Sequence, residues 1–133
     1  MVLVNATRRT MLADQCRFAN TVLKRMIGLL NRNCLGAGEG LLIDRCYGIH
    51  TFGMRFAIDV LFLDKELRVI RAVPGLPPLR TCAVRHAVYA LELPVGSIAQ
   101  SGTQTGDQVQ IQVRSAADST VNVKSPVAAK AQA

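Results

Sequence analysis

Residues 57–73 decide the fold class, and they read Ala57-Ile-Asp-Val-Leu-Phe-Leu-Asp-Lys-Glu-Leu-Arg-Val-Ile-Arg-Ala-Val73. Two runs rich in β-branched and other apolar residues, 57–63 and 67–73, flank the polar turn 64–66. This arrangement is typical of a β-hairpin. We therefore predict that the two runs pair antiparallel.

Further short strands are predicted on both sides of this hairpin. We expect a hairpin within residues 1–18 and strands at 41–43, 86–93 and 108–113, and we expect the proline-rich stretch 74–78 to break the ladder as a loop. Apolar residues at helical spacing follow the N-cap pair Asn20-Thr21 and predict one helix that ends near Asn33. The fold class is therefore mainly β, a compact antiparallel barrel-like or sandwich-like domain with one short helix.

Composition divides the chain into one domain and a tail. The 133 residues are enough for a single domain, predicted over 1–114. Residues 115–133 are rich in Ala and Ser without apolar periodicity, which predicts a disordered tail.

Charge and hydropathy exclude several classes of protein. The net charge is +7, but the 16 basic residues are spread along the chain, which predicts no specific nucleic-acid partner. No apolar run approaches the roughly 20 residues of a membrane span, and the N-terminus has no signal-peptide pattern, so we expect a cytoplasmic protein.

The polar residues with the greatest potential for chemistry lie between 46 and 59. Asp59 is a lone carboxylate in a strand that is apolar on both faces, so the folded chain must supply it with hydrogen-bond donors. The nearest in sequence are Thr51, Arg55 and the amides of the intervening glycine-containing loop. A structural role, tying down this loop, competes with a functional role, orienting His50. The structural role is favoured, because buried carboxylates that anchor loops are commoner than catalytic ones, so Asp59 is expected to matter more to stability than to turnover.

Glu92 is the third candidate catalytic residue, after His50 and Asp59. It alternates with Tyr89, Leu91 and Leu93 and so lies on the other face of its strand. It is either an outer-surface residue or a second carboxylate facing the same cleft as Asp59. A carboxylate pair would be suited to acid–base chemistry on a sugar or an ester.

Two cysteine–histidine pairs, Cys46-x3-His50 and Cys82-x3-His86, have the residue types of a zinc site. Residues i and i+4 on a strand lie about 13 Å apart, too far to bind one ion without a turn between them. We therefore predict no metal and no other cofactor.

The ordered motifs of the chain resemble a known family. These motifs are Arg25-x-x-Gly28-Leu29, Ile49 to Asp64, Ala90 to Gly96 and Gly106-Asp107-Gln-Val. They are similar to the prokaryotic domain of unknown function family 192, over about residues 5–113. The resemblance implies a small, mostly β, barrel-like domain with one short helix and no established activity. Ala57 stands where a proline is usual in that family.

Three functions are compatible with these observations. The leading interpretation is a binding or accessory module for an unknown small ligand or protein, with a mouth formed by His50, Thr51, Met54, Arg55 and Asp59. The alternative is a small hydrolase-like enzyme that uses His50 with Asp59 or Glu92. A purely structural protein partner is the third.

Overall fold

The computed structural model describes residues 1–20 and 32–112. The predicted mainly β fold with a short helix is confirmed, although the sheets in the described part of the chain do not close into a barrel. The elements are β1 (Val2–Asn5), β2 (Thr10–Ala13), β3 (Gln15–Ala19), β4 (Glu39–Asp44), β5 (Gly48–His50), β6 (Ile58–Leu63), β7 (Val69–Leu76), β8 (Thr81–Ala83), β9 (Tyr89–Pro94), α2 (Ser97–Ser101) and β10 (Val109–Gln112).

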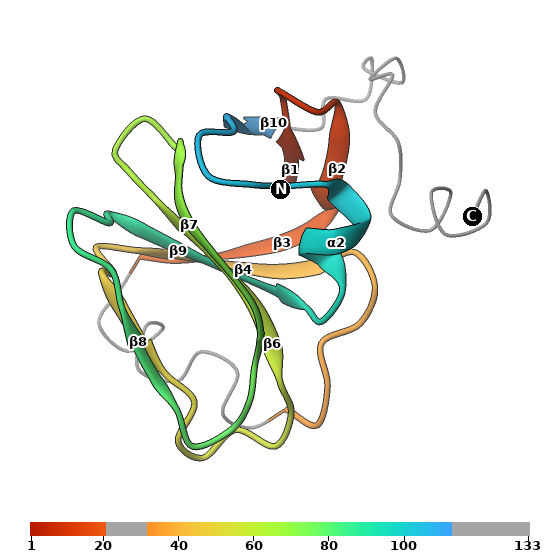
Figure 1. The fold of residues 1–133 in the computed structure, drawn as a ribbon. Helices are drawn as coiled ribbons and strands as arrows, with labels where there is room; N and C mark the ends of the chain where they lie inside the picture. Colours follow the sequence, from red (N-terminus) through yellow and green to blue (C-terminus); the bar gives the residue numbers. More distant parts are fainter. Residues whose placement is uncertain (21–31, 113–133) are drawn as a thin grey trace.

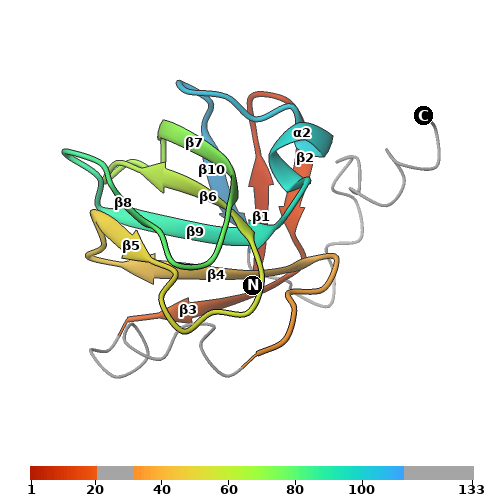
Figure 2. The same ribbon diagram turned by 60° about the horizontal axis from the view of Figure 1, so that its bottom comes forward.

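A five-stranded sheet in the order β3-β4-β9-β6-β7 forms the middle layer. All its pairs are antiparallel except β3 with β4, which run parallel. The three-stranded sheet β10-β1-β2 and α2 lie on one side of this layer, and the two-stranded sheet β5-β8 lies on the other (Figure 1). Figure 2 shows β5 and β8 together at the opposite end of the molecule from β1 and β2.

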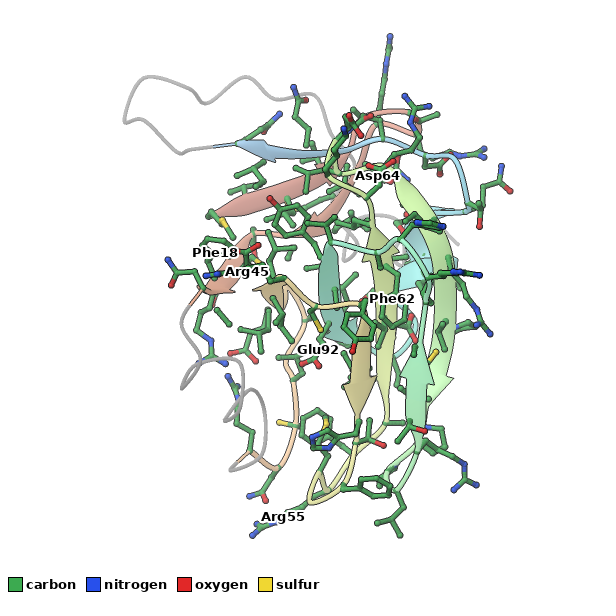
Figure 3. All side chains as sticks on the ribbon, turned by 90° about the vertical axis from the view of Figure 1, so that its left-hand side faces the viewer. Phe18, Arg45, Arg55, Phe62, Asp64 and Glu92 are labelled. Atoms are coloured by element: carbon green, nitrogen blue, oxygen red, sulfur yellow. The ribbon has the colours of Figure 1, made fainter. Side chains whose placement is uncertain are left out.

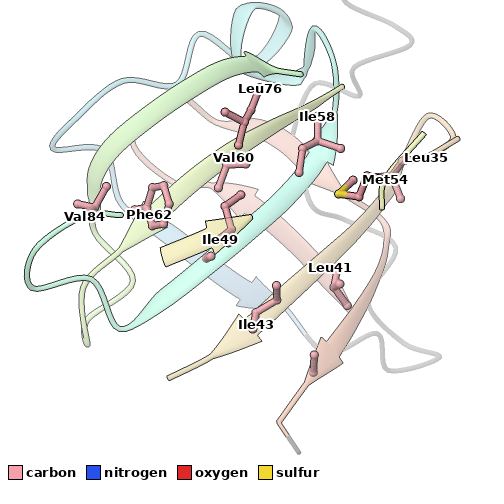
Figure 4. Close-up of a cluster of buried hydrophobic side chains, with 12 residues drawn as sticks. Leu35, Leu41, Ile43, Ile49, Met54, Ile58, Val60, Phe62, Leu76 and Val84 are labelled. Atoms are coloured by element: carbon pink, nitrogen blue, oxygen red, sulfur yellow. The ribbon is translucent and has the colours of Figure 1, made fainter. Parts of the chain in front are cut away.

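Each face of the central sheet covers its own apolar cluster. Alternate residues of β6 divide between them: Ile58, Val60 and Phe62 face the β5–β8 side, whereas Leu61 and Leu63 face β1, β2 and α2. Figure 4 shows the first cluster, with Ile49 of β5 packed over the sheet. All of β6 is buried, as expected of a strand that is apolar on both faces.

The predicted hairpins are confirmed. β6 pairs antiparallel with β7, and β1 pairs antiparallel with β2. The last strand, β10, pairs with β1, so the two ends of the described chain meet in one sheet.

Asp107, just before β10, accepts hydrogen bonds from the amide of Gln104 and the side chains of Asn5 and Arg8. Although burial opposes ionisation, these bonds hold the pKa of Asp107 below its ordinary value.

Two local predictions were wrong. The stretch 74–78 does not break the ladder, because β7 continues through Pro74 and Gly75 to Leu76. The strand predicted from His86 begins only at Tyr89, since His86 has a positive φ in the turn before it. The helix α2 and the short strands β5 and β8 were not predicted.

Two predictions lie outside the described residues: the helix ending near Asn33, which falls almost entirely within 21–31, and the tail 115–133. Within the described ranges, no helix is long and apolar enough to cross a membrane.

Candidate functional site

Asp59 binds two backbone amides on the α2 side of the central sheet. Its Oδ1 accepts a hydrogen bond from the Gly75 amide at 2.8 Å, and its Oδ2 accepts one from the Ile98 amide at 2.9 Å. Its side chain is enclosed, with 1% of the residue exposed. The carboxylate therefore ties β6 to the end of β7 and to the first turn of α2, whose own N-cap residue, Gly96, has no side chain to cap it.

The donors expected for Asp59 were wrong. Thr51 and Met54 belong to the segment that covers the opposite face of the sheet, and Arg55 donates to Asn33 Oδ1 at 2.7 Å instead. The amides that Asp59 binds come from a different glycine-containing segment and from α2. Asp59 thus lies outside the predicted mouth, and its structural role differs from the predicted one, because it holds β7 and α2 and not the loop before it.

Glu92 lies on the other face of the same sheet. In β9 it pairs with Leu41 of β4 and Val60 of β6, both members of the apolar cluster beneath β5 and β8. Asp59 pairs with Leu93, a member of the opposite cluster. The two carboxylates therefore do not face one cleft, and Glu92 is not an outer-surface residue: both alternatives for its position were wrong.

The environment of Glu92 differs sharply from that of Asp59. Only 5% of the residue is exposed, and Oε2 has no hydrogen-bond partner in the part of the chain that the structure describes. Burial raises the pKa of Glu92 to about 7. Figure 3 shows Glu92 in the interior, whereas Arg55 lies at the far edge of the molecule.

His50 points away from both carboxylates. It is exposed at the end of β5, while its neighbour Ile49 is buried in the cluster on the Glu92 side. Successive side chains of a strand lie on opposite faces, so His50 is directed outward. Its ring stacks on Phe52, with centroids 5.7 Å apart and an interplanar angle of 27°. The three candidate catalytic residues are therefore not brought together.

Thr51 holds the segment after His50 in place. It is fully buried, and its hydroxyl donates to the Pro77 carbonyl at 2.6 Å and accepts from the Arg80 amide at 2.9 Å. Its carbonyl accepts hydrogen bonds from the amides of Met54 and Leu79. Thr51 thus connects the chain after β5 to the chain before β8, at the end of the covering sheet.

Exposed apolar and basic side chains surround this connection. Phe52 is 48% exposed, and Leu79 is 65% exposed in a left-handed conformation with φ of 62°. We name the group His50, Phe52, Arg55, Leu79 and Arg80 the His50 surface. His50 and Phe52 flank Thr51 in the sequence, Leu79 and Arg80 hydrogen-bond to it through their backbones, and Arg55 follows Met54, which does so too. Met54, by contrast, is buried beneath the covering sheet.

Of the residues on the His50 surface, only His50 and Arg55 could be predicted from the sequence; Phe52, Leu79 and Arg80 were not. The exposure of Phe52 could have been predicted, because a large aromatic residue next to a glycine in a polar loop has little chance of burial. The place of Leu79 and Arg80 could not have been predicted. They approach Thr51, some 30 residues away along the chain, only because β5 pairs with β8.

The cysteine–histidine pairs do not form a cluster. Cys46 Sγ lies 3.0 Å from the Gly48 carbonyl oxygen, and His86 lies in the turn after β8. Among residues 1–20 and 32–112, no three side chains of His, Cys, Asp or Glu are grouped so that they could hold a metal ion. The prediction that the protein binds no metal remains a prediction.

Comparison with known proteins places the chain in a family. Residues 3–111 match the DUF192 family, described as "Uncharacterized ACR, COG1430". A UPF0127 protein of Thermococcus sibiricus is 30% identical over 136 residues, covering 97% of this chain and 88% of that protein. The UPF0127 protein PYRAB11210 of Pyrococcus abyssi is 30% identical over 116 residues, covering 82% and 96%.

A solved structure shares the fold. It is a protein of unknown function from Novosphingobium aromaticivorans, 19% identical, with a TM-score of 0.70 over 83% of this chain and 82% of that chain. The match over 3–111 and the two archaeal relatives agree with the order of motifs in the sequence. The chain therefore belongs to the DUF192 family.

Proposed function

We propose that the protein is an accessory module that binds a protein partner through the His50 surface. The observation that carries this proposal is the exposed His50–Phe52 ring stack beside Leu79, held in place from below by the buried Thr51. Exposed aromatic and arginine side chains on a rigid base are typical of the anchors of protein interfaces.

The charge around the surface favours an acidic partner. Segments 45–58 and 67–91, which contain β5, β7 and β8, have no Asp or Glu. They contain six arginines, Arg45, Arg55, Arg68, Arg71, Arg80 and Arg85. Arg55 and Arg80 are exposed on the His50 surface itself. Because complementary charge accelerates and orients association, the partner segment should carry carboxylates beside an apolar side chain.

The residues of the predicted mouth take different parts in this proposal. His50 and Arg55 contact the partner, whereas Thr51 and Met54 support the surface from within. Asp59 does not belong to it, because it lies on the other face of the central sheet. The hydrolase-like alternative has less support, because His50 points away from Glu92 and both Asp59 oxygens accept backbone amides.

The experiment is selection of a random peptide library against the whole protein. Counter-selection uses the variant Phe52→Ala/Arg55→Glu, so that only peptides that need the His50 surface survive. We expect the enriched peptides to combine acidic residues with a large apolar residue. No enrichment, or enrichment of basic peptides, would contradict the proposal.

Matched variants then locate the binding site. The affinity of an enriched peptide, measured by fluorescence anisotropy, should fall at least tenfold for Phe52→Ala and for Arg80→Glu. Val95→Ala and Lys65→Glu, which change exposed residues elsewhere, should leave the affinity unchanged. A duplex DNA of the same label should not compete with the peptide.

A further inference from the structure

Glu92 is a buried acceptor that the described structure leaves without a donor. Its Oε2 has no hydrogen-bond partner within residues 1–20 and 32–112, and the residue is 5% exposed. The neighbours across the sheet are Leu41 and Val60, and the rest of that cluster is apolar. Buried carboxyl groups are almost always paired, and an apolar side chain of similar size would avoid the loss of hydration. The position of this acid therefore requires an explanation outside the packing.

Among residues 1–20 and 32–112, no charged group pairs with Glu92. No ion pair among the described residues involves Glu92. The partly buried side chains packed against the cluster include the thiols of Cys46 and Cys82, which carry no positive charge in either protonation state. Burial raises the pKa of Glu92 to about 7, so both protonation states are accessible near neutral pH. A cation placed against Oε2 would hold the group ionised.

The layer over Glu92 is separable from the central sheet. Among the described strands, β5 and β8 pair only with each other. Their contact with the central sheet is made by apolar side chains such as Ile49 and Val84, with the backbone bond from Cys46 to Val88 at one end and the Thr51 bonds at the other. Displacement of this layer would therefore break no ladder hydrogen bond of the five-stranded sheet.

We propose that Glu92 anchors a site for a small organic cation, a primary ammonium or amidinium group on an apolar body, between the central sheet and the β5–β8 layer. The cationic group donates to Oε2, and the apolar body contacts side chains such as Val60 and Ile49. A buried charge-assisted hydrogen bond of this kind satisfies both groups at once. This site is separate from the His50 surface and does not depend on it.

The test uses benzylammonium as the probe and the full chain as the protein. Titration followed by amide NMR should show saturable shifts in β4, β6 and β9 at pH 8, where Glu92 is ionised. At pH 5, where Glu92 is protonated, the affinity should be at least tenfold weaker. Benzyl alcohol, which has the same shape without the charge, should also bind at least tenfold more weakly at pH 8.

Variants identify the anchor. Glu92→Gln should abolish the pH-dependent binding, whereas Glu66→Gln, at an exposed position, should leave it unchanged. The pH series needs only the unaltered protein, so the test stands even if Glu92→Gln folds poorly. Absence of shifts in β4, β6 and β9, equal affinity at the two pH values, or unchanged binding by a folded Glu92→Gln variant would overturn the proposal.

Discussion

Two carboxylates on neighbouring strands show that the face of the sheet on which a residue lies determines its role. Asp59 on β6 accepts amides from β7 and α2, whereas Oε2 of Glu92 on β9 has no partner in the described structure. Burial alone raises the pKa of Glu92. The same residue type is therefore a structural tie on one side of the sheet and an unsatisfied group on the other.

Asp59 is predicted to matter to stability. Asp59→Ala leaves the amides of Gly75 and Ile98 unpaired, which should lower the free energy of unfolding by about 1–3 kcal/mol. Asp59→Asn keeps one acceptor oxygen and should lose less. Denaturant unfolding measures both, with Asp44→Ala at a partly exposed position as the control. An Asp59→Ala variant as stable as the parent would contradict this role.

Glu92 predicts a pH dependence of stability. Its pKa rises from 4.5 to about 7 on folding, so the native state binds more protons between these values. The contribution of Glu92 to the free energy of unfolding is fully present below pH 4.5, and it is lost as the pH rises from there through 7. At about 1.4 kcal/mol per pKa unit, the loss by pH 8 is about 3 kcal/mol.

The comparison with Glu92→Gln isolates this effect from other titrating groups. Denaturant unfolding across the pH range should show that the stability difference, variant minus parent, increases between pH 4.5 and 8. A difference that stays constant with pH would show that Glu92 titrates normally in the folded protein.

The face of each residue within its own strand could be predicted from the sequence, because side chains alternate with a period of two. This placed Asp59 with Leu61 and Leu63, and Glu92 opposite Leu91 and Leu93, as observed. The relation between the two faces could not be predicted, because it depends on the register of β6 against β9. The alternation of side chains along one strand does not show how it pairs with another strand as distant in the sequence as β9 is from β6.

At the scale of elements, the hairpin β6–β7 could be predicted because its turn and its two runs are local. The end of β7 could not. Pro74 is tolerated there because β7 is an edge of the sheet in the described chain, where a missing amide is no loss. A shift in register opposite Asp59, together with the positive φ of Gly75, directs the Gly75 amide to the carboxylate.

The elements α2, β5 and β8 were missed because they are too short to show a period. All three are stabilised by residues distant in the sequence: Asp59 binds the first turn of α2, and β5 pairs with β8, where Ile49 lies opposite Cys82. The arrangement of the His50 surface depends on the second of these pairings, so the sequence predicted only part of it.

Thr51 is predicted to fix the end of the β5–β8 layer. Thr51→Val removes the hydroxyl that binds the Pro77 carbonyl and the Arg80 amide, which should destabilise the protein by about 1–3 kcal/mol. Thr51→Ser keeps the hydroxyl and serves as the matched control. Amide hydrogen exchange should become faster in β5 and β8 for the valine variant. Equal exchange in both variants would show that the hydroxyl does not hold this layer.

At the scale of the whole molecule, the first and last strands of the described chain, β1 and β10, pair with each other. We propose that the folded domain comprises residues 1–114 and that residues 115–133 are a disordered tail, as their composition predicts. Deletion of 115–133 should therefore leave the thermal unfolding midpoint unchanged. A decrease of several degrees would place part of the tail in the folded domain.

The proposed function depends most on contact between the His50 surface and an acidic partner. The direct measurement is photo-crosslinking in cells of the source organism, with a photoreactive phenylalanine derivative in place of Phe52 and, as the matched control, in place of the exposed Val95. Mass spectrometry of the crosslinked peptides should identify, at position 52 and not at 95, one protein segment rich in Asp or Glu beside an apolar side chain. Crosslinks no more frequent at 52 than at 95, or crosslinks to a basic segment, would contradict the account.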